Sequence, residues 1–147
     1  MGQILMENGW LLDKDLQDSR VIDQNEVKLY KEKAIIAYLD VPSVKVPNPT
    51  PVENDEGKII GQAHVFIYNQ KLIADVLIDY STPERLSAET RDGVRYWVRA
   101  VGMFEVEVDR LLDFGKPIVA AVQIKKLVLS TERPYDRRLL PFGDPIL

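Results

Sequence analysis

The clearest pattern in the chain is the largely apolar stretch from Ile59 to Asp79, which polar residues interrupt once near its middle. It predicts two β-strands, in which successive side chains point to opposite faces. The interruption falls at residues 68–71, which we interpret as the turn of a β-hairpin. In the first strand, Val65 would lie on one face and His64, the only histidine of the chain, on the other.

Further apolar runs predict more strands. Residues 34–39 and 117–131 are rich in apolar side chains, which is typical of buried strands. Residues 94–108 alternate apolar and polar positions, which predicts a half-exposed strand. Gly102 interrupts this last pattern, and a glycine in a strand indicates a bulge or the close approach of another backbone or a ligand.

One short helix is predicted just after the hairpin. Thr82 can cap the free amides of a first turn, and Pro83 suits the first helical position because it has no N–H to leave unpaired. Glu84 would favour the positive end of the helix dipole. Few residues of the segment are apolar, so we expect the helix to lie on the surface and to run to about Arg91.

Together these elements predict a mainly β fold, a barrel or sandwich of about five or six strands, with one short surface helix and extended arms at both ends. We divide the chain into an N-terminal arm (1–26), a β-rich core domain (27–132) and a C-terminal arm (133–147). A chain of 147 residues is the size of one ordinary domain.

A proline-rich stretch and the two arms are candidate contact surfaces. Residues 45–58 predict a long loop, because proline fixes φ and removes an amide donor, and such loops are usually functional or mobile. The arms carry large apolar residues that a monomer would expose, which favours contacts with its own body or with other subunits. The predicted interface anchors are Trp10, Leu11, Leu12, Pro47, Pro49, Pro51, Tyr135, Phe142 and Leu147.

Composition excludes several classes of function. The chain has no cysteine, which removes disulfides, thiolate nucleophiles and cysteine-based metal sites, and one histidine is too few for a histidine-rich metal site. The acidic run 53–56 lacks the alternating ligands of an EF-hand, so we expect no metal and no cofactor. A net charge of −4 argues against binding nucleic acid through its phosphates.

The N-terminus has neither a basic start nor a small-residue cleavage site, so we expect no secretion by a signal peptide. No apolar run approaches the length of a membrane span, so we expect no membrane partner. The expected partners are protein subunits, in a homo-oligomer or a viral assembly, and the expected location is a virion or the host cytoplasm.

One enzymatic reading pairs His64 with a serine. A hydroxyl becomes nucleophilic when a base such as histidine lies within hydrogen-bond reach, and Ser130, at the end of a buried strand, is the best available candidate. The residue types alone would also fit a half-buried strand histidine with a satisfied hydrogen bond. The first hypothesis is a small serine hydrolase that uses these two residues.

A second reading is a ligand- or peptide-binding β-barrel module. It predicts a well-defined pocket near Trp97 and Gly102. The stretch RYWVR, residues 95–99, interleaves aromatic and basic residues as stacking platforms for single-stranded nucleic acid do, but the acidic net charge argues against that function. The simpler interpretation is a sheet face whose arginines form ion pairs with Glu105, Glu107 or Asp109. We also expect Asp75 to pair with an arginine such as Arg95 or Arg99.

The order of elements also resembles the prohead proteases of HK97-type phages. The resemblance covers about residues 34–136 and rests on the run VENDEGKIIGQAHVFIYNQKLIADVLID, the helix and glycine-containing strand that follow, and IKKLVLSTERPYD. The position that matches the family's catalytic histidine is Asn54, whose amide is not basic, and the region that matches the serine, residues 99–102, contains none. The resemblance therefore implies a protease-like fold that has lost its catalytic pair.

The leading expectation is a non-enzymatic structural or assembly protein, a phage head or virion component whose arms and proline-rich loop make subunit contacts. The serine hydrolase and the binding module are the alternatives.

Overall fold

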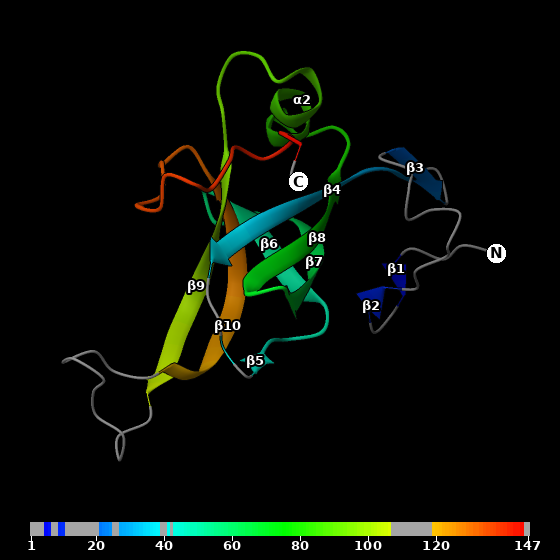
Figure 1. Cartoon of the computed structure of the whole chain (residues 1–147). Helices are drawn as coiled ribbons and strands as arrows, with labels where there is room; N and C mark the ends of the chain where they lie inside the picture. The colour runs from blue at the N-terminus through cyan, green and yellow to red at the C-terminus, as the bar shows by residue number, and fades with distance from the viewer. Residues whose placement is uncertain are drawn as a thin grey trace.

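The computed structural model of the chain describes residues 5–6, 9–10, 21–24, 27–38, 41, 43–106 and 119–145. Figure 1 shows a curved sheet with a short helix at one end, and a separate two-stranded sheet near the N-terminus. The elements are β1 (Leu5–Met6), β2 (Gly9–Trp10), β3 (Val21–Gln24), β4 (Val27–Tyr38), β5 (Val44–Lys45), β6 (Thr50–Asn54), β7 (Ile59–Tyr68), β8 (Lys71–Asp79), α2 (Pro83–Thr90), β9 (Trp97–Val106) and β10 (Val119–Ser130). The prediction of a mainly β fold with one short helix is confirmed.

The main sheet has eight strands and is not closed. Its order runs β3-β4-β8-β7-β6-β10, and β9 pairs with β10 in antiparallel fashion along almost the whole strand. A strand has only two edges, so β5 and β6, which both pair with β10 in parallel, share its other edge. Among the described strands none joins β9 to β4, so the barrel prediction is wrong, and the sheet has more strands than the five or six expected.

The hairpin is confirmed. β7 and β8 pair from Gly61 opposite Ile78 to Tyr68 opposite Lys71. The turn residues Asn69 and Gln70 have φ of 49° and 61°, which is the geometry of a type I′ turn and matches the twist of the strands. As the alternation predicted, Val65 is buried and His64 is exposed.

The helix is confirmed as well. The Thr82 side chain accepts a hydrogen bond from the Arg85 N–H, so Thr82 caps the first turn. Arg91 adopts a left-handed conformation with φ of 55° and ends the helix. The helix is not purely a surface element, because Glu84, Ser87 and Ala88 are buried.

The proline-rich stretch is not one long loop. Residues 50–54 form β6, which lies inside the sheet between β7 and β10. Proline can enter this strand because Pro51 pairs only with β7, at Gln62, and the ladder with β10 begins at Val52. The turn 55–58 then leads into β7, so the loop prediction for 45–58 is wrong over residues 50–54.

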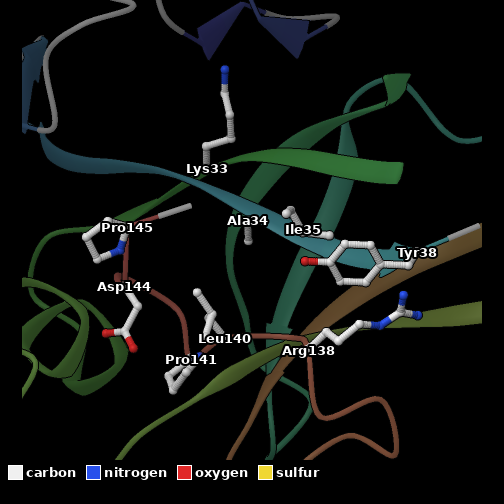
Figure 2. Close-up of a pocket in the computed structure, with 9 residues that line it drawn as sticks. All are labelled: Lys33, Ala34, Ile35, Tyr38, Arg138, Leu140, Pro141, Asp144 and Pro145. Atoms are coloured by element: carbon white, nitrogen blue, oxygen red, sulfur yellow. The ribbon is translucent and has the colours of Figure 1, made fainter. Parts of the chain in front are cut away.

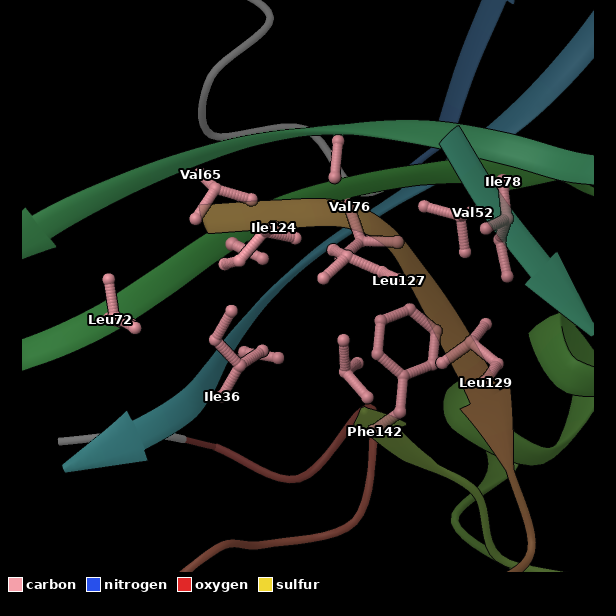
Figure 3. Packing of buried hydrophobic residues seen from close by; sticks show 14 of the residues in the cluster. Ile36, Val52, Val65, Leu72, Val76, Ile78, Ile124, Leu127, Leu129 and Phe142 are labelled. Carbon is pink, nitrogen blue, oxygen red and sulfur yellow. The ribbon is translucent and has the colours of Figure 1, made fainter. Parts of the chain in front are cut away.

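The apolar core lies on the concave side of the sheet, where side chains from β4, β6, β7, β8 and β10 meet (Figure 3). Phe142, from the C-terminal segment, is packed among them with 2% of its surface exposed. Its prediction as an anchor for another subunit is therefore wrong. The segment around it looked like an arm because its prolines prevent regular structure, yet this one side chain belongs to the core of its own chain.

Candidate functional site

A pocket lies where the sheet fails to close, between β4 and β9. It has a volume of about 450 Å³ and is open to solvent. Its walls come from β4, β8, β9, β10 and the segment after β10, and we call it the Trp97 pocket. The lining residues are Ile36, Ala37, Leu72, Trp97, Val98, Arg99, Ala100, Val122, Glu132, Arg133, Pro134, Tyr135 and Leu139.

The pocket exists because two strands approach each other without pairing. In Figure 1 the end of β4 lies beside β9. The register of β4 against β8 shifts between Ile35 and Ala37, so a bulge increases the local twist at this end of the strand. The gap is filled at one end by Phe142, whose N–H donates to the Tyr96 carbonyl oxygen at 2.6 Å. The other end of the gap stays open as the Trp97 pocket.

Most of the lining is apolar, and the charges stand at the rim. Arg99 forms an ion pair with Glu132 at 3.1 Å, and both side chains are mostly exposed. Arg133 is exposed and has no ion-pair partner among the described residues. The Nε1 atom of Trp97 is buried and has no acceptor within the described part of the protein. The site can thus hold an apolar group and offers one cation for an acidic one.

A second, smaller hollow of about 200 Å³ lies on the other side of β4, against the C-terminal segment (Figure 2). The charged side chains that line it, Lys33, Arg138 and Asp144, already form ion pairs with other residues of the chain. The Arg138 guanidinium stacks over the Tyr38 ring at 4.2 Å and donates two hydrogen bonds to the Asp136 carboxylate, at 2.9 and 2.7 Å. These bonds, together with one from the Arg138 N–H, hold the pKa of Asp136 below its ordinary value. We regard this hollow as part of how the segment is attached.

The structure does not bring the predicted catalytic pair together. His64 is exposed on β7, and its ring stacks on that of Phe66 with 5.6 Å between the ring centroids. Ser130, in contrast, is buried at the end of β10. The strand pairings place His64 and Ser130 about six residues apart along the strand direction, which corresponds to about 20 Å, and β6 lies between their two strands. The Ser130 hydroxyl instead accepts the Glu132 N–H at 3.1 Å. His64 and Ser130 therefore do not form a nucleophile–base pair.

The arginines of the sheet face pair with other acids than those expected. Arg99 forms its ion pair with Glu132, and Asp75 pairs with Lys33 at 3.6 Å rather than with Arg95 or Arg99. Arg95 pairs with Asp144 of the C-terminal segment. The prediction for Asp75 failed because it assumed that β8 and β9 were neighbours, whereas β4 lies beside β8.

The remaining predicted interface residues lie at varied positions. Tyr135 is fully exposed at the rim of the Trp97 pocket. Pro47 is exposed, while Pro49 and Pro51 are half-buried. The side chains of Trp10, Leu11, Leu12 and Leu147 lie outside the described residues.

The binding-module alternative predicted one pocket near Trp97 and Gly102, whereas the structure has a pocket at Trp97 that Gly102 does not line. The prediction missed the contributions of Ile36, Leu72 and Leu139, because these come from elements distant in sequence. Near Gly102 there is a shallower hollow of about 110 Å³, formed with Met103 and Gln123.

Within the described ranges, no three acidic or histidine side chains are grouped so that they could hold a metal ion. No helix of the described part is both long and apolar enough to cross a membrane. Comparison with models of known protein families, with curated proteins and with solved structures gives no match. The resemblance to prohead proteases stays a prediction.

Proposed function

We propose that this chain is a non-enzymatic interaction module that binds an extended, apolar segment of a partner polypeptide in the Trp97 pocket. The observation that carries the proposal is an open apolar pocket that lies between an edge of β4 and an edge of β9. On its pocket side, β9 pairs with no described strand, because β10 occupies the opposite edge. On its pocket side, β4 pairs with β3 only as far as Tyr30. Free strand edges are templates for an added strand, since their N–H and C=O groups lack partners.

The dimensions support a segment of a few side chains. A volume of about 450 Å³ is within the range of ligand pockets, and the floor is formed by aliphatic residues such as Leu72 and Val122. The backbone of the segment would follow β9 and alternate side chains would enter the pocket. Arg133 favours a segment that carries an acidic residue near its apolar one.

The proposal fits the expected role in assembly better than it fits hydrolysis. A module that binds a partner's segment needs no nucleophile, and His64 and Ser130 lie far apart. That the partner belongs to a phage head or virion is a prediction that rests on the family resemblance alone.

The test is a selection of displayed peptides on the immobilised full chain. Selected peptides should carry apolar residues at alternate positions and bind the Ala37→Phe variant at least about tenfold more weakly, because the new ring fills the pocket. The matched control is Val94→Phe, which adds a similar bulk at an exposed site outside the pocket. Since Ala37→Phe could disturb folding, the exposed Arg133→Glu is a second variant and should weaken binding of acidic peptides. Equal affinity for wild type, Ala37→Phe and Arg133→Glu would refute the proposal.

A further inference from the structure

The sheet has a second buried face, on the side opposite the core. We call it the outer face, and it consists of alternate residues of β8 and their partners on β7, whose side chains point away from the core: Ile73, Asp75, Leu77, Gln62, His64 and Phe66. On this face Leu77 is 1% exposed, Ile73 7% and Asp75 9%. Neither Ile73 nor Leu77 belongs to the core cluster, so the packing of the core does not account for their burial.

The strands themselves cannot bury the outer face. The cross-strand neighbours of Leu77 are Lys31 of β4 and Gln62 of β7, which stand beside it and leave it open from above. The helix α2 and the segment after β10 contribute Ala88 and Phe142 to the core, on the other side of the sheet. The burial is found in a single chain, so a further part of the same chain covers this face.

Two polar atoms of the outer face describe the cover further. The Nε2 atom of Gln62 and the Oδ1 atom of Asp75 are shielded from solvent, and neither has a hydrogen-bond partner among the described residues. The ion pair of Asp75 with Lys33 is long, at 3.6 Å. Since buried polar groups are normally hydrogen-bonded, the covering segment should offer donors and acceptors as well as apolar side chains.

The position of the β1–β2 hairpin identifies the covering segment. In Figure 1 this hairpin and the C-terminal segment lie on different sides of β4 and β8. Figure 2 agrees, because the C-terminal residues lie below β4 and the Lys33 side chain points the other way, toward the dark blue strands of the hairpin. Because Phe142 of the C-terminal segment lies in the core, the hairpin lies on the side of the outer face.

We propose that residues 1–20 of this chain dock on the outer face, with Trp10 as the main anchor. The segment is rich in large apolar side chains, namely Ile4, Leu5, Met6, Trp10, Leu11, Leu12 and Leu16. It also carries four acidic and two basic residues, and the 52% exposed Lys33 side chain is a cation that these acids can approach.

The segment is long enough to reach. Its last residue precedes Val21, which pairs with Tyr30 of β4, so the segment starts at the edge of the sheet. From β3 across β4 and β8 to β7 is about 14 Å, at three strand spacings. A chain of 20 residues can extend over about 60 Å. The segment can therefore cross the outer face and return, as a hairpin requires.

This docking assigns Trp10, Leu11 and Leu12 to contacts within the chain, although the sequence predicted them as interface anchors. A large apolar side chain is stabilised by such a contact, because it leaves water. The outer face and the Trp97 pocket are formed by different residues, so the two proposals can fail separately.

The test places a fluorescent label on the outer side of the sheet in the full chain. The chain has no cysteine, so Lys33→Cys gives a single site for a bimane label, whose emission tryptophan quenches on contact. In the Trp97→Phe background Trp10 is the only tryptophan. We expect the labelled protein to lose most of its emission relative to the same protein with Trp10→Phe. The matched control is a bimane at Asp92→Cys, an exposed position after α2, whose emission should not depend on Trp10.

A mixing experiment separates the chain's own segment from that of a second copy. Labelled chains with Trp10→Phe are mixed with an excess of unlabelled chains that retain Trp10. Docking within one chain predicts no quenching in this mixture, and quenching within the Trp10-containing labelled chain that is unchanged on dilution. Quenching in the mixture would overturn the proposal in favour of a second copy. Equal emission of the Lys33→Cys label with and without Trp10 would overturn it outright.

Discussion

The N–H of Phe142 donates to the carbonyl oxygen of Tyr96 at 2.6 Å, and this bond fixes the C-terminal segment beside β9. The Phe142 ring meets the Tyr30 ring edge-on, with centroids 6.2 Å apart. Arg95 and Asp144 add an ion pair, and the Arg91 Nε donates to the Gly143 carbonyl at 3.1 Å. The segment thus closes one end of the gap in the sheet and leaves the other end as the Trp97 pocket.

Phe142 should therefore be a major contributor to stability. We expect Phe142→Ala to lower the free energy of unfolding by about 3–5 kcal/mol, because it removes a ring from the core and leaves a cavity. Urea unfolding followed by circular dichroism measures the change. Tyr135→Ala, in the same segment but fully exposed, is the control and should cost less than about 0.5 kcal/mol. Similar effects of the two substitutions would show that the segment is not part of the core.

Gly61 should not tolerate a side chain. A Cβ at this position would collide with the carbonyl oxygen of Leu77 and the Cα of Ile78, on the neighbouring strand. Since backbone atoms cannot move aside without breaking the β7–β8 ladder, Gly61→Ala should destabilise the fold by at least about 2 kcal/mol. The exposed His64→Ala on the same strand should change stability by less than about 0.5 kcal/mol. A neutral Gly61→Ala in urea unfolding would contradict the β7–β8 register.

The hairpin turn can be improved. Gln70 has φ of 61°, a conformation that costs a residue with a side chain more than it costs glycine. Gln70→Gly should raise the free energy of unfolding by about 0.5–1 kcal/mol, as judged by the thermal midpoint. Gln123→Gly, in the middle of β10, should lower it, because glycine is unfavourable inside a strand. If both substitutions destabilise the protein, residues 69–70 do not form this turn.

Glu84 should make stability depend on pH. The side chain is 4% exposed, and its Oε1 atom has no hydrogen-bond partner in the described part of the chain. Burial, and then the negative charges of Asp55 and Glu56, raise the pKa of Glu84 above its ordinary value of 4.5. The folded state therefore holds this proton more tightly than the unfolded state, and the contribution of Glu84 to stability falls as the pH rises from about that value to the raised pKa.

Replacing Glu84 by glutamine should remove this dependence. Glu84→Gln should be more stable than wild type at neutral pH, by on the order of 1 kcal/mol, and the two proteins should converge at acidic pH. Urea unfolding at a series of pH values measures both effects. Glu89→Gln, an exposed position on the same helix, should follow the wild-type profile. A Glu84→Gln profile with the wild-type slope would mean that another group titrates.

Local signals explain what could be predicted from the sequence. The two apolar runs of the β7–β8 hairpin, the Thr82 cap with Pro83, and the glycine at 102 each determine structure over a few residues. The structure confirms all three. A Cβ at Gly102 would meet the Gln123 carbonyl of the paired strand, and the β10 register shifts near this point, between Ile124 and Lys126, so both expected reasons for the glycine apply.

The failures concern relationships between distant segments. Whether the sheet closes depends on the space between β4 and β9, and no local pattern reports it. Phe142 could not be assigned to the core from its proline-rich surroundings. The prediction that His64 and Ser130 form a catalytic pair required their strands to be neighbours. In the sheet, β6 lies between those strands. The pocket predicted near Trp97 and Gly102 is two separate hollows, because the elements that close the larger one around Trp97 are distant in sequence and do not reach Gly102.

The most direct test of the central claim, that the Trp97 pocket is a binding site, is a fluorescence titration. In the Trp10→Phe variant, Trp97 is the only tryptophan, and its emission can be followed as anilinonaphthalene sulfonate, an apolar anion, is added. The account predicts saturable quenching of Trp97 by energy transfer, lost when Ala37→Phe is added and retained with Val94→Phe. Quenching that does not saturate, or that persists unchanged with Ala37→Phe, would contradict it.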